Sequence, residues 1–286
     1  MEERNERGET LEEFLARYDE TKYRRPSNTV DMILLTVLKG KLKVLLVKRK
    51  DHPFIHDWAM PGGFVNFDED LDNAMKRELE EETNLFDSTY FRQLYTFGNA
   101  DRDPRTRVIT TVYLSMTPAE NIKMTSAGDD AMDTGWFTIQ KITTTTDGYE
   151  RKSVLMLDEE EKGIHLRYEI YDTACDNYVQ TRSKLLDSSN AKLAADHIKA
   201  INMAIDVVRN RAASTGIMFN LLPKECTLRE IQEVYEAIVN HPVDTGNFRR
   251  DIKKMLVATG NTTIVNGRKV ATYSFNPLLP FVKETL

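Results

Sequence analysis

The pattern of apolar and polar residues in the first half of the chain predicts several strands and one helix. Residues 30–38 form a nearly unbroken apolar run, as expected for a strand buried on both faces. The turn Lys39-Gly40-Lys41 follows, and the next apolar segment predicts the second strand of a hairpin. Further elements are expected at 42–47, 94–97, 108–116 and 136–137 (strands) and at 71–82 (helix).

The middle of the chain predicts another hairpin and a longer helix. Residues 152–171 alternate around a charged tip at 159–163, which indicates two strands joined by a turn. Residues 194–211 predict a helix, because their apolar residues recur at intervals of three and four. These positions are Ile198, Ile201, Ile205 and Val208.

The first 28 residues form a charged N-terminal extension. Thr10 and Glu13 have the spacing of a capping box, and Leu11, Phe14 and Leu15 give the segment after it a short apolar face. We expect a short helix there, packed on the main body of the protein or on a partner subunit.

Near Ser214-Thr215-Gly216 the pattern changes, and we place a domain boundary there. A helix is expected at 227–239, a second one at 245–257, and then a hairpin at 262–275 around Asn266-Gly267. Two helices followed by a hairpin resemble a winged helix-turn-helix. The predicted parts are the extension 1–28, a first domain 29–214 with a hairpin insertion at about 150–172, and a C-terminal domain 215–286.

Composition narrows the class of protein. The chain has 286 residues, of which 41% are hydrophobic and 29% charged, as in globular proteins. Its formal net charge of −6 argues against a protein that coats nucleic acid over its whole surface. Cys175 and Cys226 stand far apart, so neither a disulfide framework nor a zinc site is expected. Without a signal peptide or a run of ~20 apolar residues, we expect a cytoplasmic protein that does not contact membrane.

The strongest chemical pattern is GFVNFDEDLDNAMKRELEEETNL at residues 63–85. Glu78, Glu81 and Glu82 follow the i, i+3, i+4 spacing, so a helix projects their carboxylates to one side. Crowded carboxylates repel one another unless a cation neutralises them, and Mg²⁺ or Mn²⁺ prefers such oxygen ligands. The segment therefore predicts a metal site at Glu78, Glu81 and Glu82.

This segment resembles the Nudix box, G-x5-E-x7-R-E-U-x-E-E-x-G-U, where U is a bulky aliphatic residue. Asn84 stands where the family has glycine, and asparagine is the next most tolerant residue in a left-handed turn. The resemblance implies an α+β fold, the Nudix α/β/α sandwich with a mixed sheet. It also implies that Arg77 orients Glu69 or a neighbouring carboxylate. The matching residues are Gly63, Glu69, Arg77, Glu78, Leu79, Glu81, Glu82 and Leu85.

Other residues of the first domain are weaker candidates for the same site. Gly62 and Gly63 would let the backbone turn tightly and approach the metal. Arg102 and Arg105 either clamp a diphosphate or belong to a polar turn with a surface ion pair. Asp129-Asp130 lies where many Nudix hydrolases carry an acidic catalytic residue; Asp130 is either the general base or part of an acidic turn.

The C-terminal domain carries a local positive charge. Residues 227–286 contain 8 basic and 6 acidic side chains, a net charge of +2 in a chain of −6. In a winged helix such cations contact DNA phosphates and base edges. The alternative is a basic helix face on a packing or dimerisation module. The candidate DNA-binding residues are Arg249, Arg250, Lys253, Lys254, Arg268 and Lys269.

Together the two domains resemble the Nudix-related transcriptional regulator family over residues 29–286, most particularly in TLREIQEVYEAI and NFRRDIKKM. That resemblance implies a homodimer that senses ADP-ribose and represses genes of NAD metabolism. Two hypotheses follow. The first, favoured by the complete set of glutamates, is a Mg²⁺-dependent hydrolase that splits the diphosphate of ADP-ribose or a similar nucleoside diphosphate-X. The alternative is an ADP-ribose-sensing repressor that binds operator DNA, with weak or no hydrolysis.

Overall fold

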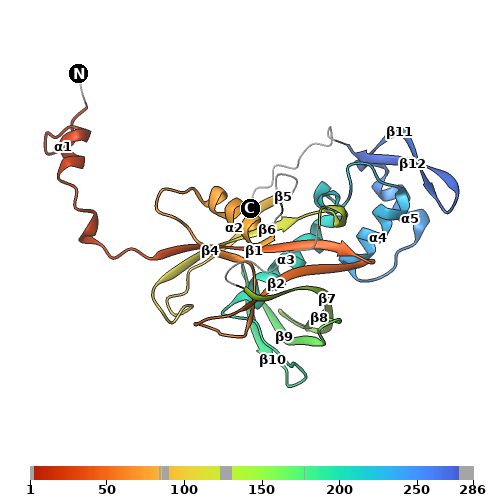
Figure 1. Ribbon diagram of the computed structural model, residues 1–286, viewed down its shortest axis with the longest axis horizontal. Helices are drawn as coiled ribbons and strands as arrows, with labels where there is room; N and C mark the ends of the chain where they lie inside the picture. Colours follow the sequence, from red (N-terminus) through yellow and green to blue (C-terminus); the bar gives the residue numbers. More distant parts are fainter. Residues whose placement is uncertain (1–2, 84, 86–89, 123–130, 177, 277–286) are drawn as a thin grey trace.

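A large mixed sheet forms the centre of the computed structural model, which describes residues 3–83, 85, 90–122, 131–176 and 178–276. The strand order is β10-β9-β8-β7-β2-β1-β6-β5 (Figure 1). Strand β1 pairs in parallel with β6, whereas β1 with β2 and β2 with β7 pair antiparallel. The short β3 pairs with β2, and β4 pairs with β1. The bounds are β1 Ser27–Leu38, β2 Lys41–Arg49, β3 Trp58–Ala59, β4 Gly62–Phe64, β5 Tyr90–Phe97, β6 Val108–Met116, β7 Ala131–Asp147, β8 Glu150–Glu159, β9 Ile164–Cys175 and β10 Tyr178–Leu185.

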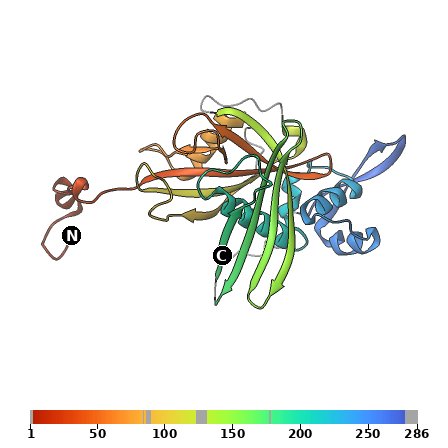
Figure 2. The same ribbon diagram turned by 90° about the horizontal axis from the view of Figure 1, so that it is seen from below.

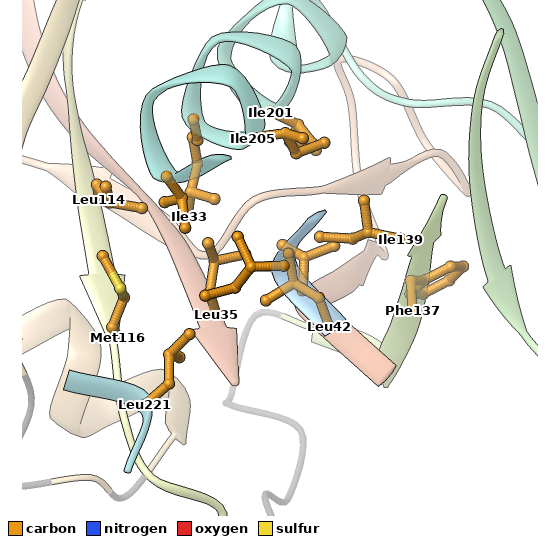
Figure 3. Close-up of a cluster of buried hydrophobic side chains, with 14 of the residues drawn as sticks. Ile33, Leu35, Leu42, Leu114, Met116, Phe137, Ile139, Ile201, Ile205 and Leu221 are labelled. Carbon is orange, nitrogen blue, oxygen red and sulfur yellow. The ribbon is translucent and has the colours of Figure 1, made fainter. Parts of the chain in front are cut away.

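Helices cover both faces of the sheet because successive residues of the buried strand β1 point to opposite sides. Met32 and Leu34 share a core with Met75 of α2 (Leu71–Thr83). Ile33 and Leu35 belong instead to the core that contains α3 (His197–Ala212), whose Ile201 and Ile205 lie over this face in Figure 3. The predicted α/β/α sandwich with a mixed sheet is therefore confirmed.

The hairpin expected at 152–171 is present as β8 and β9, which pair antiparallel. The long β7 before it and the strand β10 after it go beyond the elements expected from the sequence (Figure 2). The expected strand at 136–137 was too short, because the second half of β7 is a threonine-rich, exposed segment without apolar alternation. The polar, largely exposed β10 was not expected at all. An ion pair connects β7 to α3: Nζ of the buried Lys141 lies 2.6 Å from Oδ1 of the half-buried Asp206.

The C-terminal part has the winged-helix order of elements. Thr227 and Glu230 form the expected capping box at the start of α4 (Leu228–Val239). The prediction of one helix over 245–257 was wrong: α5 (Thr245–Ile252) gives way to the 3₁₀ turn η4 (Lys253–Met255) and then to strand β11. The chain leaves the helix because residues 256–258 pair with the returning strand, so the wing is β11 (Leu256–Val265) and β12 (Arg268–Phe275).

One continuous hydrophobic core joins the C-terminal elements to the sheet. Val208 of α3 lies in the same cluster as Ile238 of α4 and Phe248 of α5. The 3₁₀ segment η3 (Gly216–Leu221) follows α3 and contributes Leu221 to this cluster, as Figure 3 shows. The two parts therefore pack as one body, and the boundary at residues 214–215 stays a prediction.

The N-terminal extension points away from the body in both views (Figures 1 and 2). Its helix α1 (Leu11–Ala16) starts with the expected capping box of Thr10 and Glu13. No residue of α1 is buried, so in this single chain the helix does not pack on the main body. The remaining 3₁₀ turns are η1 (Glu20–Lys22) and η2 (Ala119–Asn121). Cys175 and Cys226 are free thiols. Among the described residues, no helix has both the length and the apolar character needed to cross a membrane.

Candidate functional site

A cavity of about 840 Å³ opens where several parts of the chain meet. They are β1, the end of β2 with the loop after it, β3, β4, helix α2, the loop at 102–105, the start of β6 and the N-terminus of α3. The cavity thus brings together all of the sequence candidates of the first domain that the structure describes. These are Gly62, Gly63, Arg77, Glu78, Glu81, Glu82, Arg102 and Arg105.

Arg77 organises the carboxylates of this cavity. Its Nε and Nη2 donate to Glu69 at 2.9 and 3.0 Å, so the expected orienting contact is present. Its Nη1 also donates to Glu78 at 2.7 Å and to Glu81 at 3.2 Å. A single guanidinium therefore holds three carboxylates, and hydrogen bonds from Arg77 lower the pKa of Glu69.

Glu78 is the buried member of the set, with a relative exposure of 7%. Burial raises its pKa above the ordinary value, because removal from water disfavours the charged form, and the contact with Arg77 opposes this shift. Glu81, by contrast, is exposed. The helix thus presents one desolvated and one solvated carboxylate to the same cavity.

The two glycines ahead of α2 allow close packing of the backbone, and their expected approach to a metal stays a prediction. A Cβ atom at Gly63 would stand 2.2 Å from Oε1 of Glu78. A Cβ atom at Gly62 would stand 2.2 Å from the carbonyl oxygen of Val30 in β1. A side chain at Gly62 would collide with the backbone of β1, and one at Gly63 would displace the carboxylate of Glu78. The two glycines therefore let β4 lie between β1 and the carboxylates of α2.

Both arginines of the 102–105 loop line the cavity, and each is held by an aspartate. Arg102 makes two bonds to Asp196, at 2.9 and 3.2 Å, and its side chain is 7% exposed. Arg105 makes two bonds to Asp103, at 2.8 and 3.1 Å, and its guanidinium lies 5.4 Å from the ring centre of Phe64. The loop therefore forms ion pairs and also supplies two cations to the cavity that the carboxylates of α2 line.

The cavity contains residues that sequence analysis missed, notably Asp31 and His197. His197 is the first residue of α3, and its Nδ1 accepts a hydrogen bond of 2.9 Å from the N–H of Met60. Burial lowers the pKa of His197 below its ordinary value. Neither residue belongs to a motif with meaningful spacing, so only the fold brings them to this site.

The chemistry of the donors fits a divalent metal ion, since three carboxylates of α2 line one cavity. Among the described residues, however, no three acidic, histidine or cysteine side chains stand close enough to form a ready metal cluster. Arg77 instead holds Glu78 and Glu81. Asp129, the candidate base Asp130, and Asn84 lie outside the described residues.

A second candidate site is the basic surface of the C-terminal domain. Arg249 and Arg250 are exposed on α5, while Phe248 and Ile252 of the same helix are buried. Lys253 and Lys254 are exposed on the 3₁₀ turn after α5, not on a continued helix as expected. Arg268 and Lys269 are exposed at the start of β12, beside the tip of the wing.

Comparison with known proteins agrees with this architecture. Residues 26–157 match the model of the NUDIX domain, and residues 218–275 match that of the NrtR DNA-binding winged helix domain. An ADP-ribose pyrophosphatase of Methanocaldococcus jannaschii is 34% identical over 129 residues, which are 45% of this chain and 72% of that protein.

Two longer matches include the C-terminal domain. The ADPR responsive transcriptional repressor NtrR of Acinetobacter baylyi is 28% identical over 266 residues, which are 92% of this chain and 87% of that protein. The crystal structure of Shewanella oneidensis NrtR complexed with a 27mer DNA superimposes with a TM-score of 0.58 at 26% identity, over 87% of this chain and 93% of that one.

The chain therefore belongs to the Nudix family. More particularly, it joins a Nudix domain to a C-terminal NrtR winged helix, and it is a homologue of the NrtR-type regulators.

Proposed function

We propose that this protein is a transcriptional regulator that binds operator DNA and responds to ADP-ribose. The observation that carries the proposal is the single hydrophobic core that joins the Nudix domain to the winged helix. A pocket and a DNA-binding module in one packed body can influence each other, whereas a hydrolase has no need of a winged helix. The similarity to an ADPR responsive repressor over 92% of the chain supports the same function. The repressor is thus better supported than the hydrolase, which the sequence alone favoured.

The cavity suits a nucleoside diphosphate ligand such as ADP-ribose. Its volume of about 840 Å³ falls in the usual range for small-molecule sites. Arg102 and Arg105 supply the planar, bidentate donors that diphosphates prefer, and Gly62 and Gly63 let backbone come close. We propose that these four residues contact the ligand.

The basic surface of the winged helix suits operator DNA. Six exposed cations on α5, η4 and the wing can neutralise phosphates and release counterions, which makes binding weaken steeply with salt. We propose that the protein acts as a homodimer, because two recognition helices related by symmetry can contact two half-sites of one operator. The six cations are Arg249, Arg250, Lys253, Lys254, Arg268 and Lys269.

Hydrolysis of ADP-ribose is a second candidate function, favoured by the intact glutamates of α2. Glu78, Glu81 and Glu82 would hold Mg²⁺ or Mn²⁺, which when bound offsets charge on the diphosphate and lowers the pKa of a water. Arg77 keeps Glu69 and the neighbouring carboxylates in position. Asp130, or one of the three glutamates, would take the proton of the attacking water.

One pair of measurements separates the two candidate functions. The first is the affinity of the protein for its operator fragment, with and without ADP-ribose; the second is turnover of ADP-ribose with Mg²⁺. A change in DNA affinity without turnover would establish a sensor. Turnover with no effect on DNA affinity would overturn the regulator and leave the hydrolase.

A further inference from the structure

Helix α3 links the cavity to the winged-helix domain. Its N-terminal residues Asp196 and His197 lie at the cavity, where Asp196 binds Arg102 and His197 binds the backbone of Met60. With 16 residues it is about 24 Å long at ~1.5 Å per residue. Its other end contacts α4, so this helix runs from the cavity to the winged-helix domain.

At the C-terminal end of α3, Arg209 contacts both α4 and the sheet. Its Nε donates to the carbonyl oxygen of Ile238 at 2.9 Å, and its Nη1 donates to that of Lys141 in β7 at 3.2 Å. Ile238 belongs to the last turn of α4, where carbonyl groups lack partners within the helix. A cation there also interacts favourably with the helix dipole. Arg209 therefore ties the end of α4 to α3 and to the sheet.

Helix α4 in turn contacts the recognition helix α5 and the turn before it. Glu236 of α4 accepts a hydrogen bond of 3.0 Å from the N–H of Val243, in the turn between the two helices. Gln232 donates to Oγ1 of Thr245, the first residue of α5, at 3.2 Å. The rings of Tyr235 and Phe248 pack with centroids 5.1 Å apart. These contacts fix the position of α5, which carries Arg249 and Arg250, relative to α4.

Asp196 has an unusual role for a residue at the start of a helix. Thr10, Thr227 and Asp244 each cap their own helix with a side-chain oxygen and an extended backbone. Asp196 has φ −101° and ψ 15°, and its side chain makes no cap hydrogen bond to the described first turn of α3. Both carboxylate oxygens bind Arg102 instead. Aspartate is a preferred N-cap residue, yet the carboxylate of Asp196 binds Arg102 at the cavity and does not cap its own helix.

We infer that Asp196 is the positioning residue through which a diphosphate in the cavity changes the winged helix. An anionic diphosphate competes with the Asp196 carboxylate for the guanidinium of Arg102. Release of Asp196 frees it to cap α3, and the resulting shift of α3 is passed through Arg209 to α4 and α5. This inference rests on the proposed function and specifies how the same pocket is regulated.

The test measures a coupling factor, the ratio of operator dissociation constants with and without saturating ADP-ribose. In the wild type we expect roughly 5- to 150-fold, the usual range for coupled sites. In Arg209→Gln the factor should fall towards one while the dissociation constant for ADP-ribose in the absence of DNA stays at its wild-type value. In Asp196→Asn the factor should also fall, and ADP-ribose should bind more tightly because Arg102 has lost its competitor. The exposed Arg182→Gln on β10 serves as control and should keep the wild-type factor.

The outcomes separate this inference from the proposed function. A wild-type factor of one would overturn the proposed regulator itself. A wild-type factor well above one that persists in both variants would overturn only the role of α3. If either variant fails to fold, hydrogen exchange in the wild type decides. ADP-ribose should then change the protection of residues 197–200 and 236–240, and unchanged protection at both would contradict the inference.

Discussion

Gly63 lies against the carboxylate of Glu78 so closely that a methyl group on Gly63 would stand 2.2 Å from Oε1. Gly63→Ala should therefore displace Glu78 from Arg77 and lower the free energy of unfolding by about 1–3 kcal/mol, the usual cost of overpacking. Chemical denaturation measures this change. The control is Gly98→Ala, whose added methyl would meet its nearest neighbour only at 4.0 Å. Equal stability of the two variants would contradict the close packing of Gly63.

Arg250→Ala should weaken operator binding without changing affinity for ADP-ribose. Its side chain is 71% exposed and pairs only with its neighbour Asp251 among the described contacts, so it is available to a phosphate. Loss of one phosphate contact should reduce the slope of log affinity against log salt by about one. Fluorescence anisotropy over a salt series measures both quantities.

The matched control for that variant is Arg182→Ala on β10. This arginine is also largely exposed and is likewise 3.2 Å from an acidic side chain, Glu150. It lies outside the winged helix, so its removal should leave the salt slope unchanged. Equal slopes for Arg250→Ala and the wild type would remove α5 from the DNA interface.

Glu82→Gln tests the candidate hydrolase. Glu82 lines the cavity beside Glu78 and Glu81, and amidation removes a metal-binding charge while preserving shape. Any Mg²⁺-dependent turnover of ADP-ribose should fall by at least about 100-fold, the upper end of what loss of a supporting residue costs. Thermal denaturation without metal should show an unchanged fold. Undiminished turnover would show that Glu82 does not hold the metal.

The buried His197 should make the free energy of unfolding depend on pH. Burial lowers its pKa below the ordinary 6.5, so the unfolded state takes up a proton first as the pH falls. The free energy of unfolding should therefore decrease below about pH 6.5, by up to ~1.4 kcal/mol per pH unit from this group. Protonation of Nδ1 would also break the hydrogen bond from Met60.

His197→Asn should remove this part of the pH dependence, because an asparagine oxygen can still accept from Met60 but does not titrate. Urea denaturation between pH 5 and 8 compares the slopes, with the exposed His56→Asn as control. Identical slopes for all three proteins would mean that the imidazole of His197 is not kept neutral by burial.

Local patterns in the sequence predicted the elements whose signals are contained in neighbouring residues. The spacing of Glu78, Glu81 and Glu82 placed them on one side of a helix that lines the cavity, as found. The capping boxes at Thr10 and Thr227 were correct, because a cap depends on residues three positions apart. By contrast, the polar β10 and the second half of β7 have no apolar alternation, so their pairing could not be foreseen.

The sequence by itself determined the Nudix helix, its glutamates and the order of the winged-helix elements, since each depends on contacts within a few residues. Only the tertiary structure decided that Arg102 meets Asp196, 94 positions away, and that Arg209 holds the end of α4. It also decided that α5 stops at Ile252, because the residues after the turn η4 pair with β12 as a strand. These contacts join residues distant in sequence, and packing around a shared core brings them together.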